Sequence, residues 1–114
     1  MVAPTAGAVV LVPFPFSDLS RSKLRPAVTL ADASRGDWVL CQITSNPYSD
    51  PWAVAISDED FRTGSLQVES YARPGKLFTA NQSLLVAQVG ELKEESFRRI
   101  ITAVVNLLQT APTK

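Results

Sequence analysis

The stretch Ala8–Phe16, AVVLVPFPF, decides how the rest of the chain is interpreted. Its first five residues are apolar and rich in β-branched side chains, a pattern typical of a buried strand. Pro13 and Pro15 then follow, and a proline has no N–H to donate to a neighbouring strand. The stretch therefore predicts a buried strand over Ala8–Val12 that ends in a rigid turn.

Similar short apolar segments recur along the chain, separated by clusters of turn-forming residues. We expect further strands at Arg25–Leu30, Trp38–Thr44, Trp52–Ile56, Leu66–Tyr71 and Ser83–Val89, the last one ended by Gly90. One helical turn is expected at Ser57–Phe61, and Arg73-Pro74-Gly75-Lys76 is predicted to form a loop. The sequence thus predicts five or six short strands, with no more than one helical turn between them.

The C-terminal part has a different periodicity. Apolar residues recur there at helical spacing, at Phe97, Ile100, Ile101, Val104, Val105 and Leu108. Short strands followed by one terminal helix indicate a mainly β fold, a small barrel, and not alternating strands and helices. A chain of 114 residues is long enough for one core, so a single domain over residues 1–114 is expected.

Composition narrows the class of protein. The hydrophobic fraction of 46% and the charged fraction of 19% are those of an ordinary globular domain. The formal net charge is +0, which argues against a protein that coats nucleic acid indiscriminately, because such binding scales with the phosphates neutralised. Any nucleic-acid site must therefore be a local patch.

The numbers of cysteine and histidine residues further limit the possible chemistry, and the N-terminal sequence bears on the location of the protein. Cys41 is the single cysteine, so no intrachain disulfide forms, and its apolar surroundings predict a small buried hydrophobe. There is no histidine, which removes the commonest general base and the commonest transition-metal ligand. We find no signal peptide and no segment long enough to span a bilayer, so a cytoplasmic location is expected.

Five segments carry a resemblance to a known family. They are Val9–Leu19 (VVLVPFPFSDL), Lys23–Ala27 (KLRPA), Gln42–Ser45 (QITS), Arg73–Thr79 (RPGKLFT) and Val89–Leu92 (VGEL). In wording and order they resemble the MazF/PemK toxins of bacterial type II toxin–antitoxin systems. The resemblance extends from about Gly7 to about Leu108.

The resemblance implies an SH3-like barrel of the CcdB/MazF/PemK type, usually a homodimer. It implies a toxin that cleaves single-stranded messenger RNA at short motifs without a metal or cofactor, and so inhibits translation and growth. The family's catalytic pair matches Arg25 and Thr44, and the cognate antitoxin would be an acidic, partly disordered segment. This assignment makes physical sense, because an arginine fork remains charged and matches the oxygens of a phosphate bidentately.

Further residues are expected to bind RNA around this pair. Ser45 follows the catalytic threonine, and cations that would extend a phosphate track are Arg21, Lys23, Arg73 and Lys76. Aromatic residues able to stack on unpaired bases are Phe16 and Tyr48, with Phe14 and Trp52 as further candidates. Without the resemblance, Phe14 and Phe16 would be assigned to core or turn packing. The acidic run Asp58–Asp60 is interpreted as a solvated helix start and not as a metal site.

The chain departs from the family pattern at two positions. Ala8 follows Gly7 where an acidic residue is common, so a hydrogen bond that supports the active-site loops is missing or replaced. Lys93 stands where a helix-capping serine is usual, which affects stability more than activity. Ala8 keeps one alternative open, a catalytically inactive homologue. A second alternative is a toxin that binds DNA gyrase as CcdB does, because that toxin shares the barrel.

Overall fold

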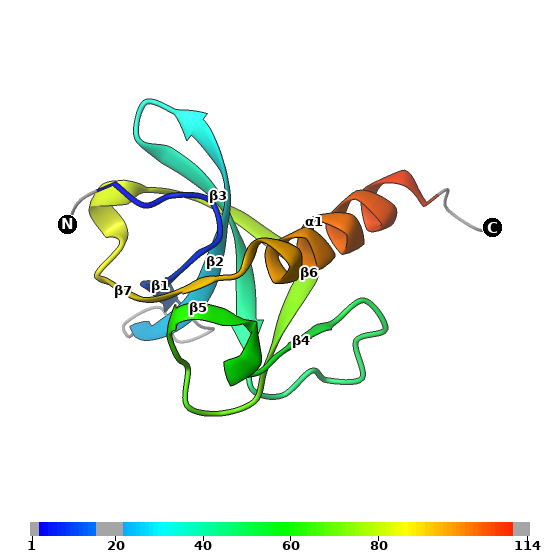
Figure 1. Cartoon of the computed structure of the whole chain (residues 1–114). Helices are drawn as coiled ribbons and strands as arrows, with labels where there is room; N and C mark the ends of the chain where they lie inside the picture. Colours follow the sequence, from blue (N-terminus) through cyan, green and yellow to red (C-terminus); the bar gives the residue numbers. More distant parts are fainter. Residues whose placement is uncertain (1–2, 16–21, 111–114) are drawn as a thin grey trace.

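In the residues that the computed structural model describes, 3–15 and 22–110, seven strands form one antiparallel sheet (Figure 1). The strands are β1 (Ala8–Pro15), β2 (Ser22–Ser34), β3 (Asp37–Thr44), β4 (Val54–Ile56), β5 (Phe61–Gly64), β6 (Ser70–Asn81) and β7 (Ala87–Leu92). Two 3-10 turns, η1 (Asp58–Asp60) and η2 (Gln82–Leu84), precede the C-terminal helix α1 (Glu94–Gln109). The mainly β fold with one terminal helix is as the sequence predicts.

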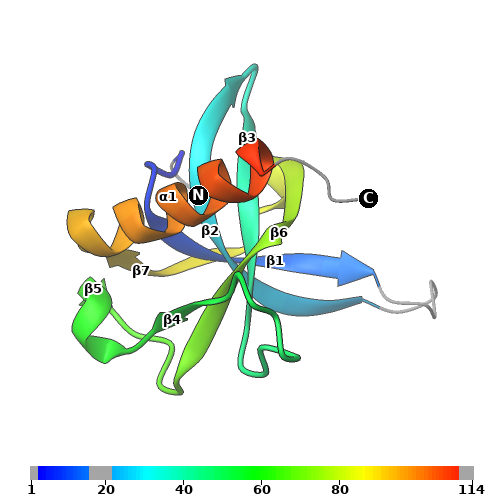
Figure 2. The same cartoon turned by 90° about the vertical axis from the view of Figure 1, so that its right-hand side faces the viewer.

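The order of the strands requires the sheet to curl. The order is β4-β6-β3-β2-β1-β7-β5, so the two edge strands are β4 and β5. In a flat sheet these edges would lie about 29 Å apart, at about 4.8 Å per strand. The chain from Ile56 to Phe61 spans at most about 17 Å. The sheet therefore bends into the half-barrel that Figures 1 and 2 show.

β1 does not end at Val12, as the sequence indicated, but continues to Pro15. The reason is its position in the sheet. β7 pairs with β1 only as far as Leu11, whereas β2 pairs with β1 from Val9 to Pro15. Beyond Leu11, none of the described strands pairs with the other side of β1, and a proline is tolerated there because no ladder hydrogen bond is lost.

The predicted loop Arg73–Lys76 is wrong, because these residues lie inside β6. The break that the sequence indicated does exist, but as an irregularity in strand pairing. Cys41 of β3 pairs with Leu77, whereas Ile43 pairs with Ala72, so four residues of β6 stand against one of β3. Pro74 is accommodated because it lies within this bulge. The strand predicted at Leu66–Tyr71 accordingly begins only at Ser70.

The last strand is also displaced from its prediction. It spans Ala87–Leu92, and the preceding Gln82–Leu84 forms the turn η2. Gly90 lies inside the strand and does not end it. A Cβ atom there would come within 2.7 Å of the Phe61 ring, so the glycine makes room for an aromatic side chain of β5.

Two apolar clusters fill the molecule. The first includes Val9, Val28 and Ile43 of the sheet with Ile100 and Val104 of the helix. α1 lies against the sheet and contacts β6 and β4 (Figure 2). The second cluster gathers Ala8, Val10, Val12, Ala27, Trp38, Leu40, Ala80 and Leu85. Ala8 is fully buried in it, which explains why a small apolar residue suits this position.

The start of the helix is held by a carboxylate from another element. Lys93 is the N-cap, and its side chain makes no capping hydrogen bond, as expected from the sequence. Asp60 Oδ1 instead accepts hydrogen bonds from Ser96 Oγ and Arg99, both at 2.8 Å. The expectation of a solvated acidic run is therefore wrong for Asp60, although Asp58 and Glu59 are exposed. Within the described ranges, no helix has the length and apolar character needed to cross a membrane.

Candidate active site

Arg25 and Thr44 lie on two neighbouring antiparallel strands. The pairing of β2 with β3 ends at Ala27 and Gln42. Arg25 and Thr44 each lie two residues beyond that pair. Because side chains alternate along a strand, a register that continued this far would put both side chains on the same face of the sheet. The sheet therefore brings the two expected catalytic residues close together.

Both residues line one pocket with a volume of about 260 Å³. Its polar lining comes from Arg25, Thr44, Ser45 and Ser70, and its apolar walls from Leu11, Pro26, Ile43, Leu66 and Val68. The pocket therefore holds one cation and several hydroxyl groups between apolar walls. In such surroundings an ion is less well screened than in bulk water, which strengthens its attraction for a phosphate.

The hydroxyl of Thr44 is oriented by the segment that follows it. The N–H of Asn46 donates to Thr44 Oγ1 at 3.1 Å, and the N–H of Tyr48 donates to Asn46 Oδ1 at 2.9 Å. Asp50 continues the pattern by accepting from the N–H of Trp52 at 2.9 Å. These successive side-chain-to-backbone turns fix the β3–β4 connection. Oγ1 thus accepts one hydrogen bond, and its own O–H can still donate.

Arg73 contacts two residues of the β3–β4 connection, Asp50 and Tyr48. Its Nε donates to Asp50 Oδ2 at 3.0 Å, and its Cζ lies 5.3 Å from the centre of the Tyr48 ring. The backbone N–H of Trp52 and the guanidinium of Arg73 lower the pKa of Asp50, and the charge of Lys76 acts in the same direction. The carboxylate is therefore ionised at neutral pH. Arg73 and Tyr48 do not line the Arg25 pocket.

The other expected RNA-binding residues are placed as follows. Lys23 on β2 and Lys76 on β6 are exposed, and Ser45 lines the pocket beside Thr44. Arg21 and Phe16 lie outside the described residues. Phe14 packs edge-on against Phe78 at 4.8 Å, beside the second apolar cluster, so it has a packing role.

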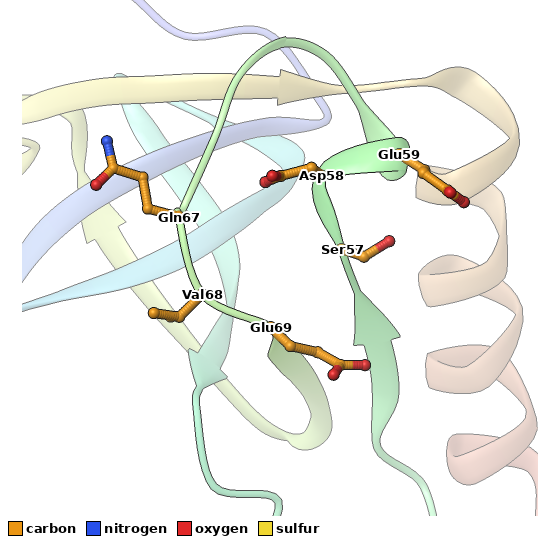
Figure 3. Close-up of a pocket in the computed structure, with 6 residues that line it drawn as sticks. All are labelled: Ser57, Asp58, Glu59, Gln67, Val68 and Glu69. Atoms are coloured by element: carbon orange, nitrogen blue, oxygen red, sulfur yellow. The ribbon is translucent and has the colours of Figure 1, made fainter.

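A second, acidic pocket borders the first (Figure 3). It has a volume of about 410 Å³ and is lined by Ser57, Asp58, Glu59, Gln67, Val68 and Glu69. Val68 lines both pockets, so the segment around it is the wall between them. In Figure 3, Asp58 points toward Gln67, whereas Glu59 points in the opposite direction. Among residues 3–15 and 22–110, no group of three or more His, Cys, Asp or Glu side chains is placed to hold a metal ion.

Sequence reasoning missed this wall. Leu66, Val68 and Ser70 were assigned to a strand, and nothing in their pattern indicated a pocket. The segment is fixed by Ser65, whose hydroxyl donates to Asp58 at 2.6 Å and accepts the N–H of Gln67 at 2.8 Å. Gln67 has a φ of 68°, a left-handed conformation that propensities do not foresee in this residue type.

Comparison with known proteins shows which family and which solved structures this chain resembles. A family model described as the PemK-like, MazF-like toxin of type II toxin–antitoxin systems matches residues 5–108. No curated protein matches the chain.

Solved structures with the same fold include three of nearly equal length. An endoribonuclease in complex with its cognate antitoxin, from a mycobacterial species, is 22% identical, with a TM-score of 0.69, covering 99% of this chain and 100% of that one. An endoribonuclease from a mycobacterial species is 23% identical, with a TM-score of 0.70 and coverages of 99% and 98%. A MazE-MazF structure from Deinococcus radiodurans is 19% identical, with a TM-score of 0.76 and coverages of 97% and 100%.

Proposed function

Because the chain belongs to the PemK-like, MazF-like toxins of type II toxin–antitoxin systems, we propose that it is a metal-independent endoribonuclease. Its substrate is single-stranded RNA, above all messenger RNA, which it cleaves at short sequence motifs in the cytoplasm. The consequence is arrest of translation and growth. The observation that carries the proposal is the convergence of Arg25, Thr44 and Ser45 on one pocket.

The proposed reaction uses the RNA's own 2′-hydroxyl. The 2′-oxygen attacks the neighbouring phosphorus in line with the 5′-oxygen, and the P–O5′ bond breaks as the new P–O2′ bond forms. The 2′-hydroxyl proton is lost and the leaving 5′-oxygen gains a proton. The products are a 2′,3′-cyclic phosphate and a 5′-hydroxyl. Negative charge builds on the non-bridging oxygens during this step, so a cation facing them accelerates it.

Arg25 is the group suited to that charge. Its guanidinium stays protonated at physiological pH and presents parallel N–H donors to two phosphate oxygens. The apolar walls formed by Leu11 and Ile43 limit the water around it. We assign Arg25 to electrostatic stabilisation of the transition state and not to proton removal, because an arginine is a poor base.

Thr44 is suited to donate a hydrogen bond to the same phosphate. Its Oγ1 accepts the N–H of Asn46, which holds the oxygen in place and leaves the hydroxyl hydrogen able to donate. Ser45 supplies a second hydroxyl in the pocket. With no histidine in the chain, proton transfer falls to hydroxyl groups, arginine or water.

RNA outside the pocket would be held by the surrounding cations and rings. Lys23 and Lys76 are exposed and available to phosphates. Arg21 and Phe16, which lie outside the described residues, are proposed as RNA contacts from the sequence alone. Tyr48, on the β3–β4 connection, contacts Arg73 of β6 outside the pocket. These contacts are expected to give RNA binding a clear salt dependence.

We further propose a cognate antitoxin and a homodimer. A disordered acidic segment that folds along the basic surface would compete with RNA for it. The solved neighbours with this fold include toxin–antitoxin complexes, which supports this choice of partner. A closed two-fold pair would bring two such surfaces together.

The test is cleavage of a long RNA in the presence of EDTA, with the ends of the fragments mapped. We expect selective cuts that leave 5′-hydroxyl ends and persist without divalent ions. Arg25→Ala should lower kcat/KM by about 100- to 1000-fold, as the loss of a charge-stabilising donor does elsewhere. Arg98→Ala, which removes an exposed helix arginine, is the matched control and should leave the rate unchanged.

Two outcomes would overturn the proposal. Intact RNA with a folded, dimeric wild-type protein would remove the nuclease assignment, and accompanying inhibition of DNA gyrase would favour the CcdB-like alternative. Cleavage that survives Arg25→Ala at full rate would point to a contaminating nuclease. Circular dichroism of each variant shows whether a loss of activity reflects loss of the fold.

A further inference from the structure

Tyr48 is the most exposed aromatic residue among those that the structure describes, and its backbone conformation costs free energy. Its side chain is 63% exposed, so it contributes little to the core. Tyr48 and Ser49 have φ values of 54° and 57°, two consecutive left-handed residues without a glycine. Such residues persist only where surrounding contacts enforce them, and they gather at functional sites.

The contacts that enforce this conformation come from both sides. Asn46 accepts the N–H of Tyr48, and Asn46 itself is bonded to the hydroxyl of Thr44 in the pocket. The guanidinium of Arg73 lies against the ring, and Asp50 fixes the guanidinium. The side chains of Arg73 and Asp50 are only 19% and 10% exposed. The Tyr48 ring thus packs against the mostly buried ion pair of Arg73 with Asp50.

We propose that Tyr48 is a stacking platform for an unpaired nucleobase next to the Arg25 pocket, and that Arg73 and Asp50 are positioning residues that hold its ring. This proposal rests on the proposed RNA-cleaving function and refines the expected role of Arg73. Because Asp50 fixes Nε of Arg73 and the guanidinium lies against the Tyr48 ring, the proposal assigns the arginine to act through the tyrosine and not as one more phosphate ligand.

The position and charge of the ring suit an RNA strand. Tyr48 is four residues from Thr44, which limits the Cα separation to about 14 Å, and the turns between them shorten it. The charges of Arg73 and Lys76 both act on Asp50, so two cations accompany one carboxylate beside the ring. A base stacked on the ring would leave its phosphates next to this net positive charge, the combination found in single-strand binding sites.

The first test measures binding to an unstructured oligoribonucleotide that spans a mapped cut and carries a 2′-deoxy sugar at that cut. Tyr48→Ala should weaken binding by about 5- to 100-fold, the range for loss of one base–aromatic stack, whereas Tyr48→Phe should stay within about twofold. Replacing the stacked nucleotide by an abasic one should remove the effect of Tyr48→Ala. Unchanged affinity of Tyr48→Ala for every such RNA would overturn the proposal.

The second test separates positioning from phosphate binding by combining variants. If Arg73 acts through the ring, Arg73→Gln weakens binding in the wild type but has little further effect on Tyr48→Ala. If it binds a phosphate, the two effects add, and the slope of log affinity against log salt falls by about one, which contradicts the positioning role. Arg98→Gln removes an exposed arginine of the helix and serves as the control.

Failure of this proposal and failure of the proposed function give different results. A wild-type protein that binds RNA but never cuts it contradicts only the nuclease assignment, because the affinity of Tyr48→Ala for any unstructured oligoribonucleotide that the wild type binds still tests the platform. Tyr48→Ala that impairs inhibition by the antitoxin while leaving RNA affinity unchanged would assign the ring to the protein partner and overturn the stacking role.

Discussion

Cys41 shows how burial controls the chemistry of a single residue. Its side chain has no exposed surface, and its Sγ donates to the carbonyl oxygen of Arg73 at 3.2 Å. Burial raises the pKa of the thiol to about 12, outweighing the hydrogen bond to the Arg73 backbone. Since the thiolate is the reactive form, the residue is a structural hydrophobe and not a nucleophile.

The resulting prediction concerns the rate of thiol labelling. In the native protein at pH 8, Cys41 should not react with iodoacetamide over hours, because the thiol is both protonated and inaccessible. In guanidinium chloride the same thiol should react at the rate of a free cysteine. Mass spectrometry of the labelled chain measures both. Rapid labelling of the native protein, with no loss of circular dichroism, would contradict the assigned burial.

Thr44 differs from Cys41 because its polar atom faces a pocket. Thr44→Val keeps the shape and removes the hydroxyl, so we expect kcat for RNA cleavage to fall by about 100-fold while the fold is kept. Thr44→Ser should retain most of the rate. Thr79→Val, on an exposed part of β6, is the matched control. A full rate in Thr44→Val would exclude the hydroxyl from the reaction.

The sequence indicated the meeting of Arg25 and Thr44, and the reason is that both belong to motifs on neighbouring strands. The resemblance supplied the pair, and the β2–β3 register explains why they converge. Sequence patterns could not reveal the ion pair of Arg73 with Asp50, because it joins residues 23 positions apart through a bulge. Side-chain partners at such a distance depend on three-dimensional packing.

At the scale of elements, prolines led to the wrong strand ends, although they correctly marked irregular pairing. Pro13 lies where β1 loses its neighbour β7, and Pro74 lies in the bulge of β6. A proline excludes a regular ladder hydrogen bond, but it does not exclude an extended backbone. The sequence alone does not say which strands have a free side, so the end of β1 and both ends of β6 were predicted too early.

The junction between η1 and α1 replaces the missing helix cap. Burial raises the pKa of Asp60, but the N–H of Ser57 and the side chains of Arg99 and Ser96 outweigh it and lower the pKa below 3.8. A carboxyl with a lowered folded pKa stabilises the fold fully above its unfolded pKa. That contribution is lost as the pH falls from about 4 through the folded pKa.

We therefore predict that Asp60→Asn lowers the free energy of unfolding by about 1–3 kcal/mol at pH 7, because buried donors such as Ser96 Oγ lose a charged acceptor. The difference from wild type should shrink below about pH 4. Urea unfolding at several pH values measures both effects. Glu94→Gln, which removes an exposed ion pair with Arg98, should change stability by less than about 0.5 kcal/mol. A pH-independent difference would contradict the role of the Asp60 charge.

At the scale of the whole molecule, charge is distributed unevenly around the Arg25 pocket. Arg73 contacts the exposed Tyr48 ring, and the charges of Arg73 and Lys76 both act on Asp50 beside it. Across the wall formed by the segment around Val68 lies the pocket that contains Asp58, Glu59 and Glu69. Although the net charge of the chain is +0, the region of Tyr48 and the acidic pocket therefore differ in the sign of their charge. An RNA strand in the Arg25 pocket should leave it toward the basic side.

Because of this asymmetry, removing an acidic side chain from the acidic pocket is predicted to increase the affinity for RNA. Glu69→Gln removes one repelling charge from the acidic pocket, so binding of an uncleavable oligoribonucleotide should tighten by about two- to fivefold at low salt. The gain should fade above about 0.3 M salt, where the screening length is well below 10 Å. Glu95→Gln removes the same charge from the exposed start of α1 and should have a smaller effect. Equal gains from both variants would mean that RNA responds only to net charge, whereas weaker binding of Glu69→Gln would mean that this carboxylate contacts the RNA favourably and does not repel it.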